Sequence, residues 1–132
     1  MSSFIDELEE PEKEELDKYR IAILESDAKV VEKSENIMRS KNALVYEEEG
    51  VFKYGLAKTK NHFTFHSMVM YSNSDVFDFI KNKVKKGAKV QKGCVNFKTT
   101  SQLPIEIFKE IMSLSATKDF SPVIEHYKKK VR

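Results

Sequence analysis

The spacing of apolar residues changes along the chain from a helical period to strict alternation. Leu16, Tyr19 and Ile23 recur at the spacing of one helix face, and Pro11 suits the first turn of that helix. From Ala43 onward the spacing changes, and the run from Asn61 to Tyr71 is the longest with period-two alternation, which is typical of a strand with one buried face. We therefore expect a helical N-terminal part in residues 1–42 and a sheet that begins at Ala43.

Two more helices are predicted before the sheet. Ser3 is a suitable N-cap for a short first helix, and Asp27 is a suitable N-cap for a third. The apolar contacts of that third helix would come from Val30, Val31 and Ile37.

Three consecutive strands are predicted next, over residues 43–47, 51–59 and 62–71. The turns between them would be 48–50 and Lys60–Asn61. The third strand is the longest alternating run, so we expect it at the centre of the sheet. One of its faces would carry Phe63, Phe65 and Val69, and the other would carry His62, Thr64, His66, Met68 and Met70.

The remaining elements alternate between helix and strand. A helix should start at Asp75 and end before Gly87, and a basic loop should lead to a fourth strand over 93–98. Pro104 and Pro122 mark the first turns of two last helices. The order α-α-α-β-β-β-α-β-α-α indicates an α+β domain of two layers, with an antiparallel sheet of about four strands and helices mainly on one face. The opposite face would be partly open to a ligand.

Composition and charge are those of a small globular protein. The chain has 132 residues, of which 40% are hydrophobic and 33% charged, and it holds one cysteine. No apolar run approaches the roughly 20 residues that span a bilayer, and the acidic N-terminus is unlike a signal peptide. We expect one cytoplasmic domain over residues 1–132, without membrane contact. Residues 1–50 hold 15 acidic and 7 basic residues, or −8, whereas residues 51–132 hold 6 and 16, or +10.

Three blocks of sequence resemble a known family. They are Tyr54–Ala57 with Lys60–Phe65, then Lys92–Lys98, and then Leu103–Glu106. Their spacing over about residues 43–115 resembles the YdhG-like domains of bacteria, a mostly uncharacterised family, and residues 116–132 would add a C-terminal helix. One branch of that family is described as a frataxin-like iron chaperone. The resemblance implies iron handling by acidic side chains, for which the candidates are Asp6, Glu9 and Glu10, and His66 is a further metal candidate.

The candidate binding residues lie on or next to the predicted sheet. We expect a non-enzymatic binding or interaction protein, and the candidate partners are a small ligand, another protein or a second copy of the chain in a homodimer. The ligand-binding candidates are Tyr54, Lys58, His66, Tyr71 and Cys94.

Two alternatives stay open. Cys94 could act as a nucleophile if His66 lay beside it on the adjacent strand. Lysines of the second half could meet nucleic acid, although residues 51–132 contain one arginine and no recognised nucleic-acid motif.

Overall fold

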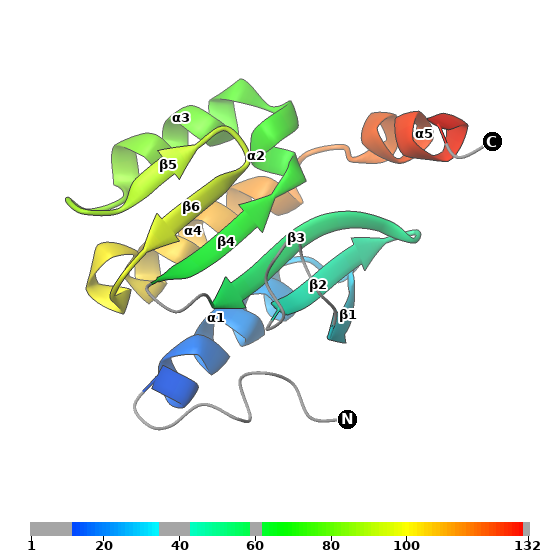
Figure 1. Cartoon of the computed structure of the whole chain (residues 1–132). Helices are drawn as coiled ribbons and strands as arrows, with labels where there is room; N and C mark the ends of the chain where they lie inside the picture. The colour runs from blue at the N-terminus through cyan, green and yellow to red at the C-terminus, as the bar shows by residue number, and fades with distance from the viewer. Residues whose placement is uncertain (1–11, 35–42, 59–61, 131–132) are drawn as a thin grey trace.

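The computed structural model describes residues 12–34, 43–58 and 62–130 (Figure 1). Its helices are α1 (Glu12–Ser26), α2 (Met68–Ser72), α3 (Ser74–Lys83), α4 (Ile105–Ala116) and α5 (Ser121–Lys130), with a 3-10 turn at Thr100–Gln102. Its strands are β1 (Val31–Ser34), β2 (Ala43–Glu48), β3 (Val51–Lys58), β4 (Phe63–Ser67), β5 (Lys89–Gln91) and β6 (Cys94–Phe97). Among these residues, no helix is long and apolar enough to cross a membrane.

The strands form one antiparallel sheet in the order β1-β2-β3-β4-β6-β5. The prediction of an α+β fold is confirmed, but the sheet has six strands among the described residues and not four. The two additional strands are the edge strands β1 and β5, which have four and three residues. Such short edge strands carry little periodic signal, and β5 lies inside the stretch that we expected to be a basic loop.

The expected third helix is wrong where the structure describes it, because Val31–Ser34 is strand β1, paired with β2. Two β-branched residues, Val30 and Val31, favour a strand here. Asp27 is not a helix cap. Its side chain accepts a hydrogen bond from the Lys29 backbone N–H (3.2 Å) and faces buried partners on β3. Ile37 and the predicted first helix after Ser3 lie outside the described residues, as does the Lys60–Asn61 turn.

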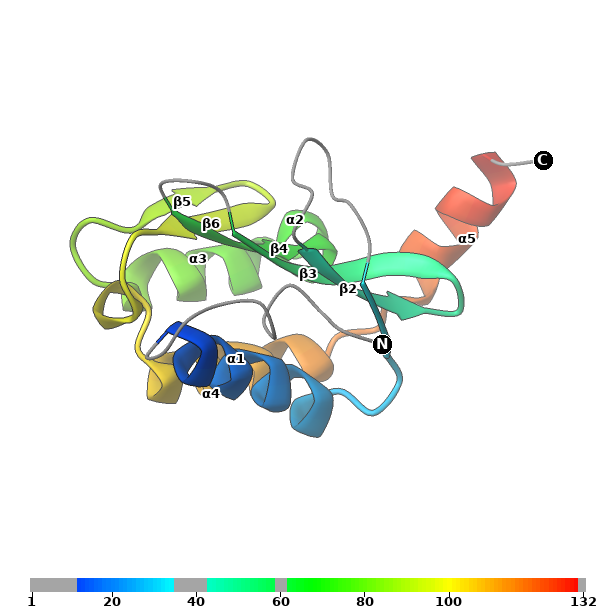
Figure 2. The same ribbon diagram turned by 60° about the horizontal axis from the view of Figure 1, so that its bottom comes forward.

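Helices α1, α3 and α4 lie together on one face of the sheet, and α5 projects from the body (Figure 2). The main core lies between these layers, where aromatic rings pack edge to face. The Phe108 ring of α4 contacts both the Tyr19 ring of α1 and the Phe65 ring of β4, at centroid distances of 4.8 and 4.9 Å. Phe63 and Phe65 therefore face the core, as predicted.

The central strand is shorter than predicted, because residues 68–72 form helix α2. The buried Ser67 side chain caps this helix by accepting a hydrogen bond from the Met70 backbone N–H (3.0 Å). Val69 and Met70 are both buried in the main core, whereas the alternating pattern had placed them on opposite faces. A run of mixed apolar residues fits either element, and the capping serine decides between them.

Replacing Ser67 with alanine is expected to lower the free energy of unfolding by about 1 kcal/mol, the usual effect of losing an N-cap side chain. Urea denaturation measures this change. Ser113→Ala, at an exposed position of α4, is the control and should change stability by less than about 0.5 kcal/mol. Equal effects of the two substitutions would contradict a capping role for Ser67.

A β-bulge interrupts strand β3. Tyr46 on β2 pairs with Tyr54, and the next residue, Glu47, pairs with Phe52, so Lys53 has no partner in the register. The extra residue shifts the alternation of side chains, so that Lys53 and Tyr54, which are neighbours in sequence, are both buried.

At the start of β3, a two-residue turn with positive φ at Glu49 and Gly50 (51° and 80°) connects the strand to β2.

Candidate binding site

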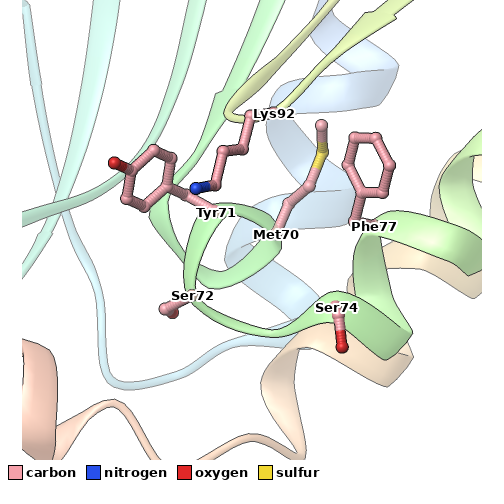
Figure 3. Close-up of a pocket in the computed structure, with 6 residues that line it drawn as sticks. All are labelled: Met70, Tyr71, Ser72, Ser74, Phe77 and Lys92. Carbon is pink, nitrogen blue, oxygen red and sulfur yellow. The ribbon is translucent and has the colours of Figure 1, made fainter.

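A hollow of about 510 Å³ opens where α2, α3 and the β5–β6 turn meet. The residues that line it are Met70, Tyr71, Ser72, Ser74, Phe77 and Lys92. Figure 3 shows the Lys92 side chain reaching from the β5–β6 turn toward Tyr71, with Met70 and Phe77 on the other side. Pockets for small ligands in proteins are typically about 300–1,000 Å³, so the hollow is large enough for one.

Two aromatic rings in this hollow each have a lysine ammonium nearby. Lys92 Nζ lies 4.8 Å from the Tyr71 ring centroid, and Lys81 Nζ lies 5.9 Å from the Phe77 ring centroid. Both distances fall within the range of cation–π attraction, and both lysines are exposed to solvent. The hollow therefore combines flat apolar surfaces with positive charge.

The exposed ring of Tyr71 lies beside the β5–β6 turn. Tyr71 is 51% exposed, and its Cδ2 atom lies 3.4 Å from the position that a Cβ atom would take at Gly93, an ordinary van der Waals distance. The Ser72 hydroxyl donates a hydrogen bond to the Met68 carbonyl (2.7 Å), so it serves the helix backbone. A ligand in the hollow would thus meet mainly rings, the Met70 thioether and an ammonium group.

Tyr54 does not line this hollow, and its role as a ligand-binding residue stays a prediction. Its side chain is fully buried, and its hydroxyl donates a hydrogen bond to Asp27 Oδ2 (2.9 Å). Burial raises the pKa of Tyr54 above its usual range, and the negative charge of Asp27 raises it further. Tyr54 belongs to the main core with Phe65, whereas Thr64 and His66 alternate to the opposite face.

His66 and Cys94 lie opposite each other in the sheet, as the nucleophile alternative requires. The His66 ring packs edge to face against Phe52, and the Cys94 thiol donates a hydrogen bond to Gln91 Oε1 (3.1 Å). Burial lowers the pKa of His66 and raises the pKa of Cys94. Both shifts favour the neutral forms, which disfavours the thiolate that a nucleophilic cysteine needs.

The face that carries His66 is not open along its whole width. Ala43, Val45 and Ala57 form a second buried apolar cluster there, with Phe52 packed against it. Lys58 is half-buried, and its Nζ lies 5.7 Å from the Phe63 ring centroid. Of the five ligand-binding candidates, the structure places Tyr71 alone on the hollow.

The described residues contain no candidate site for the predicted iron. Among them, no group of three or more His, Cys, Asp or Glu side chains could hold a metal ion. Asp6, Glu9 and Glu10 lie outside these residues. Iron handling through the acidic N-terminus therefore stays a prediction.

A buried charged cluster was missed by the reading of the sequence. Lys53 Nζ lies 2.6 Å from both Asp27 Oδ2 and Glu48 Oε1, and its side chain is 1% exposed. The Phe120 ring covers the ammonium, with its centroid 5.1 Å from Nζ. At the bulge both Lys53 and the next residue, Tyr54, contact Asp27, an arrangement that a sequence pattern does not reveal. The cluster satisfies its own hydrogen bonds and leaves no buried polar side-chain atom without a partner in the described residues.

Comparisons with known proteins give no match for this chain, neither to a protein-family model nor to a curated protein nor to a solved structure. The resemblance to YdhG-like domains therefore stays a prediction, and the functional argument depends on the geometry of the hollow.

Proposed function

We propose that this chain is a non-enzymatic binding protein and that the hollow between Tyr71 and Lys92 takes a flat, negatively charged ligand. The proposal depends on one observation. Each aromatic ring that lines the hollow has a lysine ammonium nearby, Lys92 at Tyr71 and Lys81 at Phe77. A flat ligand gains contact area against the rings and the Met70 side chain. Its negative charge would lie near the two ammonium groups.

The chemistry elsewhere supports binding over catalysis. Burial raises the pKa of Cys94, which disfavours the thiolate that a nucleophilic cysteine beside His66 would need. The buried cluster of Lys53, Asp27 and Glu48 is closed to solvent. The exposed, mixed apolar and cationic hollow is the better candidate for contact with another molecule.

Titration with indole-3-carboxylate, a flat anion, tests the proposal by NMR of labelled protein. Shifts are expected at Met70–Phe77 and Gln91–Gly93. The neutral analogue indole-3-carboxamide should bind more weakly, by about two- to fivefold, because exposed charge pairs contribute roughly 0.2–1 kcal/mol. Lys92→Gln should reduce the affinity for the carboxylate by a similar factor and leave the affinity for the amide unchanged.

The control variant is Lys109→Gln, which removes an exposed lysine of α4 outside the hollow. It should leave both affinities unchanged. Shifts that spread over the surface without clustering at the hollow, or equal effects of Lys92→Gln and Lys109→Gln, would contradict the proposed site.

A further inference from the structure

Seven lysines lie in the segment that runs from the second half of α3 through β5 and past β6. They are Lys81, Lys83, Lys85, Lys86, Lys89, Lys92 and Lys98, and residues 79–105 contain no Asp or Glu. All seven are exposed. We call them the lysine edge, because β5 is the edge strand on that side of the sheet (Figure 1).

The charge of the lysine edge is not balanced by neighbouring carboxylates. None of its seven lysines forms an ion pair within the described part of the chain. The nearest acidic residue in sequence is Asp78, three positions before Lys81 on α3, and Asp75 of the same helix is already paired with Lys118. A local charge of +7 on a chain of net charge +2 attracts a polyanion.

We infer that the lysine edge binds single-stranded nucleic acid, with one base placed in the hollow against Tyr71. This inference deepens the proposed function, because it names the flat, negatively charged ligand of the same site. Lysines would follow the phosphates while the exposed Tyr71 ring offers a stacking surface, the combination by which proteins bind single strands without sequence preference. Lys92 belongs to both features, since it lines the hollow and lies on the edge.

The other features of the edge favour this partner over a membrane or a duplex. Phe77 and Phe79 are half-buried beneath Lys81 and Lys83, so they do not project as membrane anchors. A paired base in a duplex could not reach the Tyr71 ring. The scarcity of arginine argues against the reading of particular bases, but it is compatible with binding that depends on phosphate charge.

Fluorescence anisotropy with a labelled oligothymidylate of about 12 nucleotides tests the inference, a length within the usual site sizes of small domains. Each neutralised phosphate of a single strand contributes about −0.7 to the slope of log K against log salt. Four to seven contacting lysines therefore predict a slope between about −3 and −5. Tyr71→Ala should weaken binding by about tenfold, whereas Tyr71→Phe should bind like the unchanged protein, because both rings stack.

Matched charge variants distinguish binding at the lysine edge from attraction of the oligonucleotide to any lysine on the surface. Lys85→Gln/Lys86→Gln/Lys89→Gln should reduce the slope by about 2. The control, Lys18→Gln/Lys29→Gln/Lys109→Gln, removes three exposed lysines elsewhere and should change the slope little. Circular dichroism of each variant checks that the fold is retained.

Several results would overturn the inference. The first two are an absence of oligothymidylate binding and an equal loss of affinity in the two triple lysine variants. The third is equal affinity of Tyr71→Ala and Tyr71→Phe for the oligonucleotide. The fourth is binding of polyphosphate, polyglutamate, a DNA duplex or phosphatidylserine vesicles that is as tight as or tighter than binding of the oligonucleotide. If indole-3-carboxylate still binds in the hollow while the oligonucleotide does not, the inference fails and the proposed function stands. If neither binds, both fail.

Discussion

Replacing Lys53 with alanine is expected to lower the free energy of unfolding by about 3–5 kcal/mol, the range measured when one partner of a buried ion pair is removed. The ammonium contacts Asp27 and Glu48 at 2.6 Å each. Without it, two buried carboxylates face each other with no cation between them. Urea denaturation at neutral pH measures the loss.

The matched control is Lys118→Ala, which breaks the exposed pair with Asp75. Exposed pairs contribute about 0–1 kcal/mol, so the two variants should differ severalfold. The triple variant Lys53→Met/Asp27→Asn/Glu48→Gln should recover part of the stability, because it removes the buried charges together. A loss in Lys53→Ala no larger than that in Lys118→Ala would show that water reaches the cluster.

Raising the pH above about 10 is expected to unfold the protein cooperatively, because three buried tyrosines resist ionisation. Burial raises the pKa of Tyr19, Tyr46 and Tyr54 above the usual range in each case, and nearby carboxylates add to this effect. Tyr46 donates a hydrogen bond to Glu32 (2.8 Å), Tyr54 donates one to Asp27 (2.9 Å), and Tyr19 donates one to the Leu103 carbonyl.

The sign follows from the direction of these pKa shifts. The stabilisation is fully present below the pKa of an unfolded tyrosine, about 10, and is lost as the pH rises toward the folded values. Each group contributes about 1.4 kcal/mol per pH unit in that window, so three contribute about 4 kcal/mol per pH unit. For a protein of ordinary stability, this loss leads to unfolding within about two to three pH units.

Tyrosinate absorbance and far-ultraviolet circular dichroism, recorded together during alkaline titration, measure this coupling. The chain has five tyrosines, and the two exposed ones are Tyr71 and Tyr127. In the variant Tyr71→Phe/Tyr127→Phe the absorbance comes from the three buried tyrosines alone, so it should rise together with the loss of circular dichroism. Absorbance that rises while the circular dichroism stays constant would contradict the prediction.

Elements with a strong local signal could be predicted from the sequence, and elements that depend on distant partners could not. Clear local signals are the apolar stripe of α1, the proline just before α4, and the β-branched and aromatic residues of β2 and β3. Each determines its element within a few residues. Strand β1 forms because β2 supplies its hydrogen bonds. The sequence did not predict this strand, because the local signal for a helix N-cap at Asp27 was stronger. Helix α2 depends on the hydrogen bond that Ser67 accepts from Met70.

The candidate site divides in the same way. The sequence pattern was enough to propose Tyr71 as a ligand-binding residue. It did not predict helix α2, which brings Tyr71 beside Lys92. Tyr54 was nominated for the open face, and its hydroxyl instead bonds to Asp27, which lies 27 positions earlier in the chain. The facing of His66 and Cys94 was weighed from the strand order, and the structure confirms that they are opposite. The lowered pKa of His66 and the raised pKa of Cys94 follow from burial, which the sequence pattern does not measure.

The bulge at Lys53 also has a consequence for anyone who redesigns this hairpin. The alternation of buried and outward-facing side chains shifts by one residue within β3. Val51 and Tyr54 both face the main core, although an uninterrupted strand would place residues three positions apart on opposite faces. A substitution scheme that alternates apolar and polar choices straight through β3 would be correct on one side of Lys53 and inverted on the other. The hairpin has to be rewritten as two short strands joined by a single out-of-phase residue.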